Sequence, residues 1–126
     1  MLIAFAFVAA LGGQDEPPDF AGSIACVGVA QQAVKDMRTL KRAARKDPAE
    51  LAQLESIDAV WKRVGVDAAR SAEATAASEG KTPAEQHVLG VQTRRAFDTA
   101  PPELRNAMAE SCIYKFARDE WDKRNR

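Results

Sequence analysis

The stretch that decides the fold is residues 47–80, DPAELAQLESIDAVWKRVGVDAARSAEATAASEG. It opens with a helix start signal: Asp47 can cap the helix, Pro48 suits the first helical position, and Glu50 stands at the third. Apolar residues then recur every three or four positions, the repeat of an amphipathic helix, at Leu51, Leu54, Ile57, Trp61, Val64 and Ala68. The stretch therefore predicts one long helix that ends just before Gly80.

A second helical repeat precedes this stretch. Its apolar residues are spaced by three or seven positions, which is a helical rather than an alternating pattern, at Ile24, Val27, Val34, Met37 and Leu40. We expect this helix to begin near Ala21 to Ser23, with Ser23 or Asp19 as its cap, and to end near Lys46. Residues 14–20 hold two prolines and three acids, which predicts an extended lead-in.

Two further helices are predicted towards the carboxyl end. Thr82-Pro83-Ala84-Glu85 repeats the helix start signal, and the apolar residues behind it are Val88, Leu89, Val91 and Phe97. Two prolines within residues 99–103 end that helix and start the last one, whose apolar face has members four residues apart at Leu104, Met108, Cys112 and Phe116. Short connections favour antiparallel neighbours. The sequence thus predicts an all-α fold, an antiparallel four-helix bundle formed by a single domain of residues 21–126.

The first residues differ from the rest of the chain. Residues 1–13 carry no charged side chain, and residues 2–11 form an unbroken apolar run. Such a run is too short to span a bilayer, which takes about twenty apolar residues, but it fits the apolar core of a secretory signal peptide. We therefore predict a cleavable signal in residues 1–13 and a periplasmic or secreted location, although no Lys or Arg precedes the run. The alternative is a buried helix of the mature domain.

The two cysteines agree with export. Cys26 falls in the first predicted helix and Cys112 in the last. An even number of cysteines in an exported chain indicates a disulfide, and here one intramolecular pairing is possible. The alternative is two buried, reduced thiols that act as small apolar side chains.

Composition bounds the function further. The 126 residues hold 18 Lys and Arg against 18 Asp and Glu, so the net charge is zero and no global attraction to nucleic acid is expected. One local asymmetry remains: basic residues crowd the end of the first helix, at Lys35, Arg38, Lys41, Arg42, Arg45 and Lys46. This cluster is a possible contact for an anion or a partner. A solvated face, with cations near a helix carboxyl end, is the simpler interpretation.

No catalytic or metal-binding pattern is recognisable. His87 is the sole histidine, too few for a zinc site of the usual kind, and no Cys-x-x-Cys motif occurs. Glu50, Glu55 and Asp58 lie among polar neighbours and are expected on a solvated helix face. Of the two tryptophans, Trp61 belongs to the apolar repeat, whereas Trp121 stands in a charged tail and fits either packing or contact.

These observations lead to a non-enzymatic hypothesis. We predict a small exported protein of the cell envelope that binds another macromolecule, either a protein or a polyanionic envelope component, without a cofactor, metal, nucleic acid or transmembrane span. Its oligomeric state is left open. The alternative is a small-molecule carrier with a pocket in the bundle core, in the room left by Ala68, Ala69, Ala72, Ala74, Ala76 and Ala77. In architecture alone, the layout loosely resembles the small periplasmic chaperones of the acid-stress type.

Overall fold

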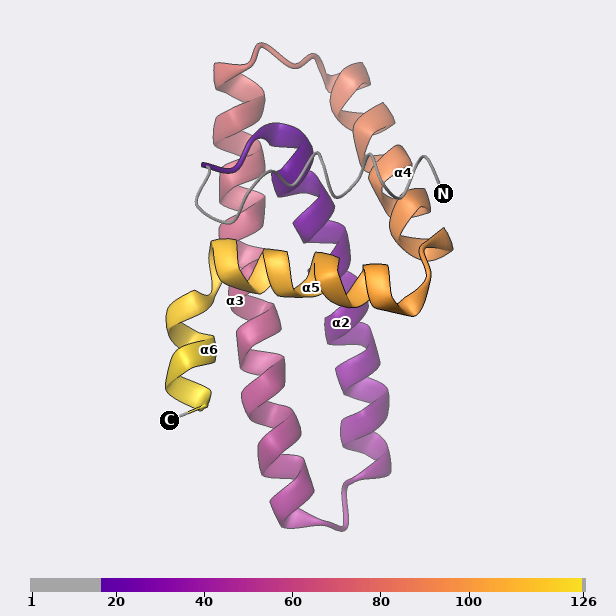
Figure 1. Cartoon of the computed structure of the whole chain (residues 1–126), viewed down its shortest axis with the longest axis vertical. Coiled ribbons are helices and arrows are strands. Elements are labelled where there is room, and N and C mark those ends of the chain that lie inside the picture. Colours follow the sequence, from indigo (N-terminus) through magenta and orange to yellow (C-terminus); the bar gives the residue numbers. More distant parts are fainter. Residues whose placement is uncertain (1–16, 126) are drawn as a thin grey trace.

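A computed structural model describes residues 17–125. This part of the chain is all-α and has no strand. Its helices are α2 (Phe20–Ala43), α3 (Pro48–Ser78), α4 (Pro83–Thr99), α5 (Pro102–Phe116) and α6 (Arg118–Arg124), as Figure 1 shows. The predicted signal, residues 1–13, and the start of the lead-in, residues 14–16, lie outside the described residues.

The two longest helices form an antiparallel hairpin (Figure 1). Asp19 caps α2 by accepting a hydrogen bond from the Gly22 N–H at 2.7 Å, and Asp47 caps α3 by accepting one from the Glu50 N–H at 3.2 Å. The helix α2 ends at Ala43, three residues earlier than predicted, because residues 44–46 form the turn that brings Asp47 to its capping position. At the other end, Gly80 follows α3 with a positive φ of 66°, as its role as a helix stop requires.

Small side chains let α2 and α3 approach closely. The hydroxyl oxygens of Ser23 and Ser71 are 2.7 Å apart and share a hydrogen bond across the hairpin. A Cβ atom on Gly65 would stand 3.6 Å from the Cβ of Ala30, so the backbones nearly touch there. The alanines of α3 divide by face: Ala68 is fully buried, whereas Ala69 is exposed. A stripe of small residues thus explains the close pair better than a cavity does.

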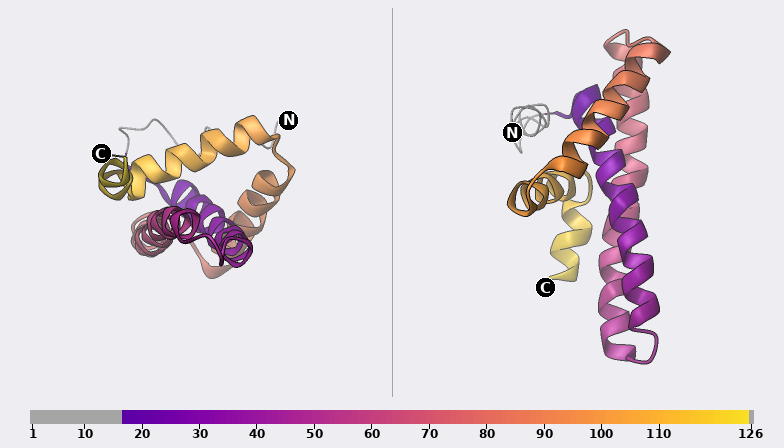
Figure 2. Two further views of the ribbon diagram at one scale, coloured as in Figure 1. Left: turned by 90° about the horizontal axis from the view of Figure 1, so that it is seen from below. Right: turned by 90° about the vertical axis from the view of Figure 1, so that its right-hand side faces the viewer.

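Helices α5 and α6 form a second layer on one face of the hairpin, and α4 leads to it along the hairpin's flank. Figure 2 shows α5 lying across one face of the hairpin near its middle, with α6 on the same side, while α4 runs obliquely along the flank of α2 from the upper end of the hairpin to the start of α5. The prediction of an all-α fold is confirmed, and α2 and α3 are antiparallel, but residues 17–125 form five helices rather than the predicted four. The last predicted helix is divided because Ala117 leaves the helical conformation, with φ −146° and ψ 28°, and is buried at the bend.

The hydrophobic core lies where the two layers meet. Buried members of the core come from α2, α3 and α5 and include Val29, Val60, Val64 and Met108. Beyond α5 the two antiparallel helices of the hairpin continue as a pair, as the lower half of Figure 1 shows. We call this part, residues 35–55, the arm. Ala44 is its one buried residue, so α4 and α5 do not cover it.

Candidate binding surface

The basic cluster of the sequence lies on the arm. Five of its six members are exposed, on the last turns of α2 and in the turn that follows, at Lys35, Arg38, Arg42, Arg45 and Lys46. None of the ion pairs among residues 17–125 involves any of these five. We call this set the basic stripe. Its side chains face solvent, and Arg42 lies in the last turn of α2, where the helix dipole favours a cation.

Lys41, the sixth predicted member, is turned away from the stripe. Its Nζ donates a hydrogen bond to the Asp58 Oδ2 at 2.9 Å, and the Nζ of Lys62 lies 3.0 Å from the same oxygen. Asp58 comes from α3 and is 4% exposed. The structure therefore places Lys41 in an ion pair that joins α2 to α3. Its ammonium group is occupied by this pair and does not belong to the exposed stripe.

Asp58 was expected on a solvated face and is instead buried. Burial alone would raise the pKa of its carboxyl group, but hydrogen bonds and charges from Lys41 and Lys62 outweigh this and hold the pKa below its ordinary value. Its second oxygen, Oδ1, is buried without a hydrogen-bond partner in the protein. The sequence held a signal for this burial, since Asp58 stands four residues after Leu54 and three before Trp61, on the apolar side of the repeat.

The stripe faces away from the second layer. Arg42 follows Cys26 by sixteen residues, which turns its side chain by about 160° around the helix axis at 100° per residue. Cys26 is the residue that joins α2 to α5. The stripe thus lies on the side of α2 opposite α5. Ile24 stands eighteen residues before Arg42, and therefore at the same angle, and it lies against Gly90 of α4, so α4 covers this side of α2 above the arm.

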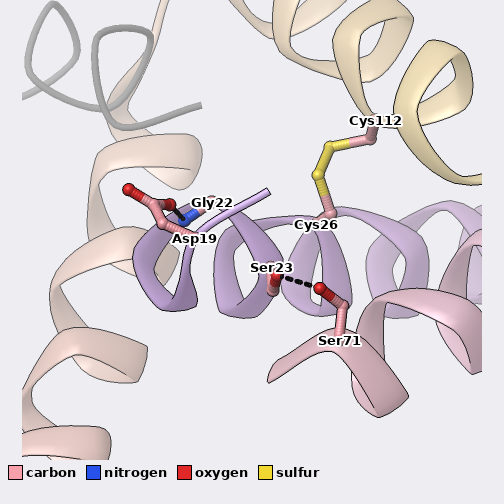
Figure 3. The surroundings of a disulfide bond; sticks show 6 residues. All are labelled: Asp19, Gly22, Ser23, Cys26, Ser71 and Cys112. Atoms are coloured by element: carbon pink, nitrogen blue, oxygen red, sulfur yellow. Dashed lines mark hydrogen bonds between the residues drawn. A yellow bond between two sulfur atoms is a disulfide. The ribbon is translucent and has the colours of Figure 1, made fainter. Parts of the chain in front are cut away.

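The predicted disulfide is present. Cys26 and Cys112 are bonded, with their Cα atoms 5.5 Å apart and 86 positions apart in sequence (Figure 3). Both cysteines are fully buried. Beside them α5 contributes Met108 as its other buried side chain, because a helix that crosses a hairpin touches it only near the middle. The bond is therefore the strongest tie between the two layers.

His87 is exposed and borders an open depression of about 490 Å³ whose one carboxylate, Asp98, already pairs with Arg94 at 3.2 Å. Glu50 and Glu55 are exposed, as predicted. Within residues 17–125, no three His, Cys, Asp or Glu side chains are grouped so that they could hold a metal ion.

Two clefts flank α5, and neither is lined by the alanines of α3. The first, of about 520 Å³, has Trp61 and Phe97 among its lining residues. The second, of about 530 Å³, lies between α5 and α6 and includes Ile113 and Trp121. Trp61 is buried as expected, whereas Trp121 is 37% exposed, with the Arg124 guanidinium 5.4 Å from its ring centre. These open clefts are candidates for a carrier function, and the alanines of α3 line neither of them.

Comparison with protein families, curated proteins and solved structures finds no match to this chain. None of the helices in residues 17–125 is both long and apolar enough to cross a membrane. The function must therefore be argued from the surface itself.

Proposed function

We propose that this chain is a non-enzymatic binding protein, periplasmic or secreted, that contacts an anionic macromolecule of the cell envelope through its basic stripe. The observation that carries this proposal is the set of unpaired cations on one face of an arm that α4 and α5 leave uncovered. Exposed cations outside any ion pair create a positive potential that attracts and orients anionic partners.

The disulfide supports the proposed compartment. Such bonds persist in oxidising environments and are rare in reducing ones, and Cys26 and Cys112 are joined here. The predicted signal in residues 1–13 is tested by the intact mass of the protein recovered from its native cell. We expect a chain shortened by about that segment, with cysteines that react with an alkylating reagent only after reduction. A full-length chain with two free thiols would overturn the envelope assignment.

Binding is tested by sedimentation of the purified oxidised protein with the envelope fraction of its own cell. The variant Arg38→Glu/Arg42→Glu/Arg45→Glu reverses three charges of the stripe. A matched control, Arg95→Glu/Arg105→Glu/Lys123→Glu, makes the same change in net charge at exposed positions of α4, α5 and α6. We expect wild type and the control to sediment and the stripe variant to stay in solution. Equal sedimentation of all three proteins would refute the proposed function.

A further inference from the structure

The shape of the basic stripe narrows the chemistry of its partner. Four of its side chains follow one another at steps of three, four and three residues, at Lys35, Arg38, Arg42 and Arg45. At a rise of 1.5 Å per residue the three that lie in α2 span about 10 Å, with one cation about every 5 Å, and Arg45 continues the file in the turn that follows. Lys46 flanks the file at the turn. This is a line of charge, not a pocket.

The file lacks the features that other partners need. Leu40, the exposed large apolar residue of the arm, is two residues from both Arg38 and Arg42, so it points about 160° away from each. A helix that lies in a lipid surface carries apolar side chains along the border of its basic face, and a protein interface centres on buried aromatic or apolar anchors. The stripe has neither.

We propose that the stripe binds a linear polyanion lengthwise, an extended chain whose carboxylate or phosphate groups pair in turn with the four cations of the file. This inference rests on the proposed function and specifies its partner. Three of the four basic side chains in the contact are not simple point charges but guanidinium groups, which bind carboxylate and phosphate with two parallel hydrogen bonds. Because every contact is ionic, binding should release counterions from the polymer and weaken steeply with salt.

The test uses the full mature, oxidised protein and two kinds of labelled linear probe, oligogalacturonates and inorganic polyphosphates of increasing length. Fluorescence anisotropy gives the dissociation constant as a function of salt. With four charge contacts, the slope of log affinity against log salt should be about −3, which is a loss of about 60-fold between about 50 and 200 mM salt. The affinity of one bound protein should rise with probe length until the probe spans all four cations. Longer probes should then bind each protein no more tightly.

The stripe variant Arg38→Glu/Arg42→Glu/Arg45→Glu should lose at least about tenfold in affinity at low salt, and the matched control variant should not. The preferred probe identifies the source of the charge, carboxylate or phosphate. Binding that does not depend on probe length would overturn the inference.

An additional experiment with lipid vesicles distinguishes this inference from the proposed function. Vesicles of phosphatidylglycerol carry negatively charged phosphate groups, as polyphosphate does, but on a flat surface and not along a chain. If the stripe variant fails to sediment with the envelope fraction while wild type binds vesicles and neither linear probe, the linear-polyanion inference is wrong and the proposed function stands. If envelope binding is also indifferent to the stripe, both fail.

Discussion

Removing the disulfide should reduce the stability of this protein by a large fraction. In the chain-entropy model, a bond that joins Cys26 and Cys112 over 86 positions stabilises the folded state by about 4.6 kcal/mol relative to the open chain. A domain of this size has a total free energy of unfolding of about 5–15 kcal/mol. We therefore expect Cys26→Ala/Cys112→Ala to keep at most about two thirds of the wild-type free energy of unfolding, and to be folded only marginally if the wild type lies near the lower end of that range.

Urea unfolding followed by circular dichroism measures this difference. Substitution also removes two buried sulfur atoms, so reduced wild-type protein, refolded and kept with a reductant, is the matched control that keeps both side chains. The crosslink accounts for the loss if reduced wild type and the double variant agree within about 1 kcal/mol, the expected cost of small cavities. A loss below about 1 kcal/mol for both would refute the reasoning.

The loss should also be uneven along the chain. Met108 and the bonded Cys112 are the buried side chains of α5, whereas α2 and α3 share most of the core. Hydrogen exchange should therefore show that the amides of α5 and α6 lose protection on reduction before those of the upper hairpin. Equal loss everywhere would mean that the two layers unfold as one unit and that packing, not the bond, holds α5 in place.

Three further predictions concern single positions. Because the pKa of Asp58 is held low in the folded state, its ion pairs stabilise above the unfolded pKa of about 3.9, and this contribution is lost as pH falls through the folded value. Asp58→Asn should thus lower the free energy of unfolding by about 1–2 kcal/mol at neutral pH and by less in acid, as judged by urea unfolding, whereas exposed Asp36→Asn should show no such trend. Thr82→Ala removes the reciprocal capping box of α4 and should cost about 1 kcal/mol in the same assay, with faster hydrogen exchange confined to the first turn of α4. Gly65→Ala should raise the melting temperature by roughly 3–5 °C, because alanine is the better helix former and its Cβ would meet that of Ala30 at an ordinary 3.6 Å. Gly65→Leu should lower the melting temperature, because the larger side chain does not fit between the helices. A leucine variant as stable as wild type would contradict the close packing of α2 and α3 at this position.

The hairpin could be predicted from the sequence because its signals are local. The caps and the repeat of three and four residues act within a few positions, whereas the turn at residues 44–46 was predicted as helix. The break at Ala117 has no such signal, since neither proline nor glycine stands there. The crossing of α5 depends on contacts between distant residues, which apolar periodicity does not encode. The crossing of α5 over the hairpin also explains why Leu104 and Phe116, on the predicted apolar face, are only half-buried.

The candidate site divides in the same way. Helical spacing sufficed to group Arg38, Arg42 and Arg45 on one face, because that grouping is a property of one helix. It did not show that Lys41 would bind Asp58, because the partner lies seventeen positions away on another helix. The sequence therefore placed one residue too many, Lys41, in the set of exposed cations.

The arm and its charges are connected physically. Residues 35–55 are held by contacts between two helices alone, and apart from Ala44 their side chains are exposed or half-buried. Such a segment has a low local free energy of opening. Mutual repulsion of the stripe's cations opposes the ordered arm, while the ion pair of Lys41 with Asp58 ties α2 to α3 at its base. An anionic partner would remove that repulsion and bind the ordered arm more tightly than the open one, so binding and ordering of the arm should reinforce each other.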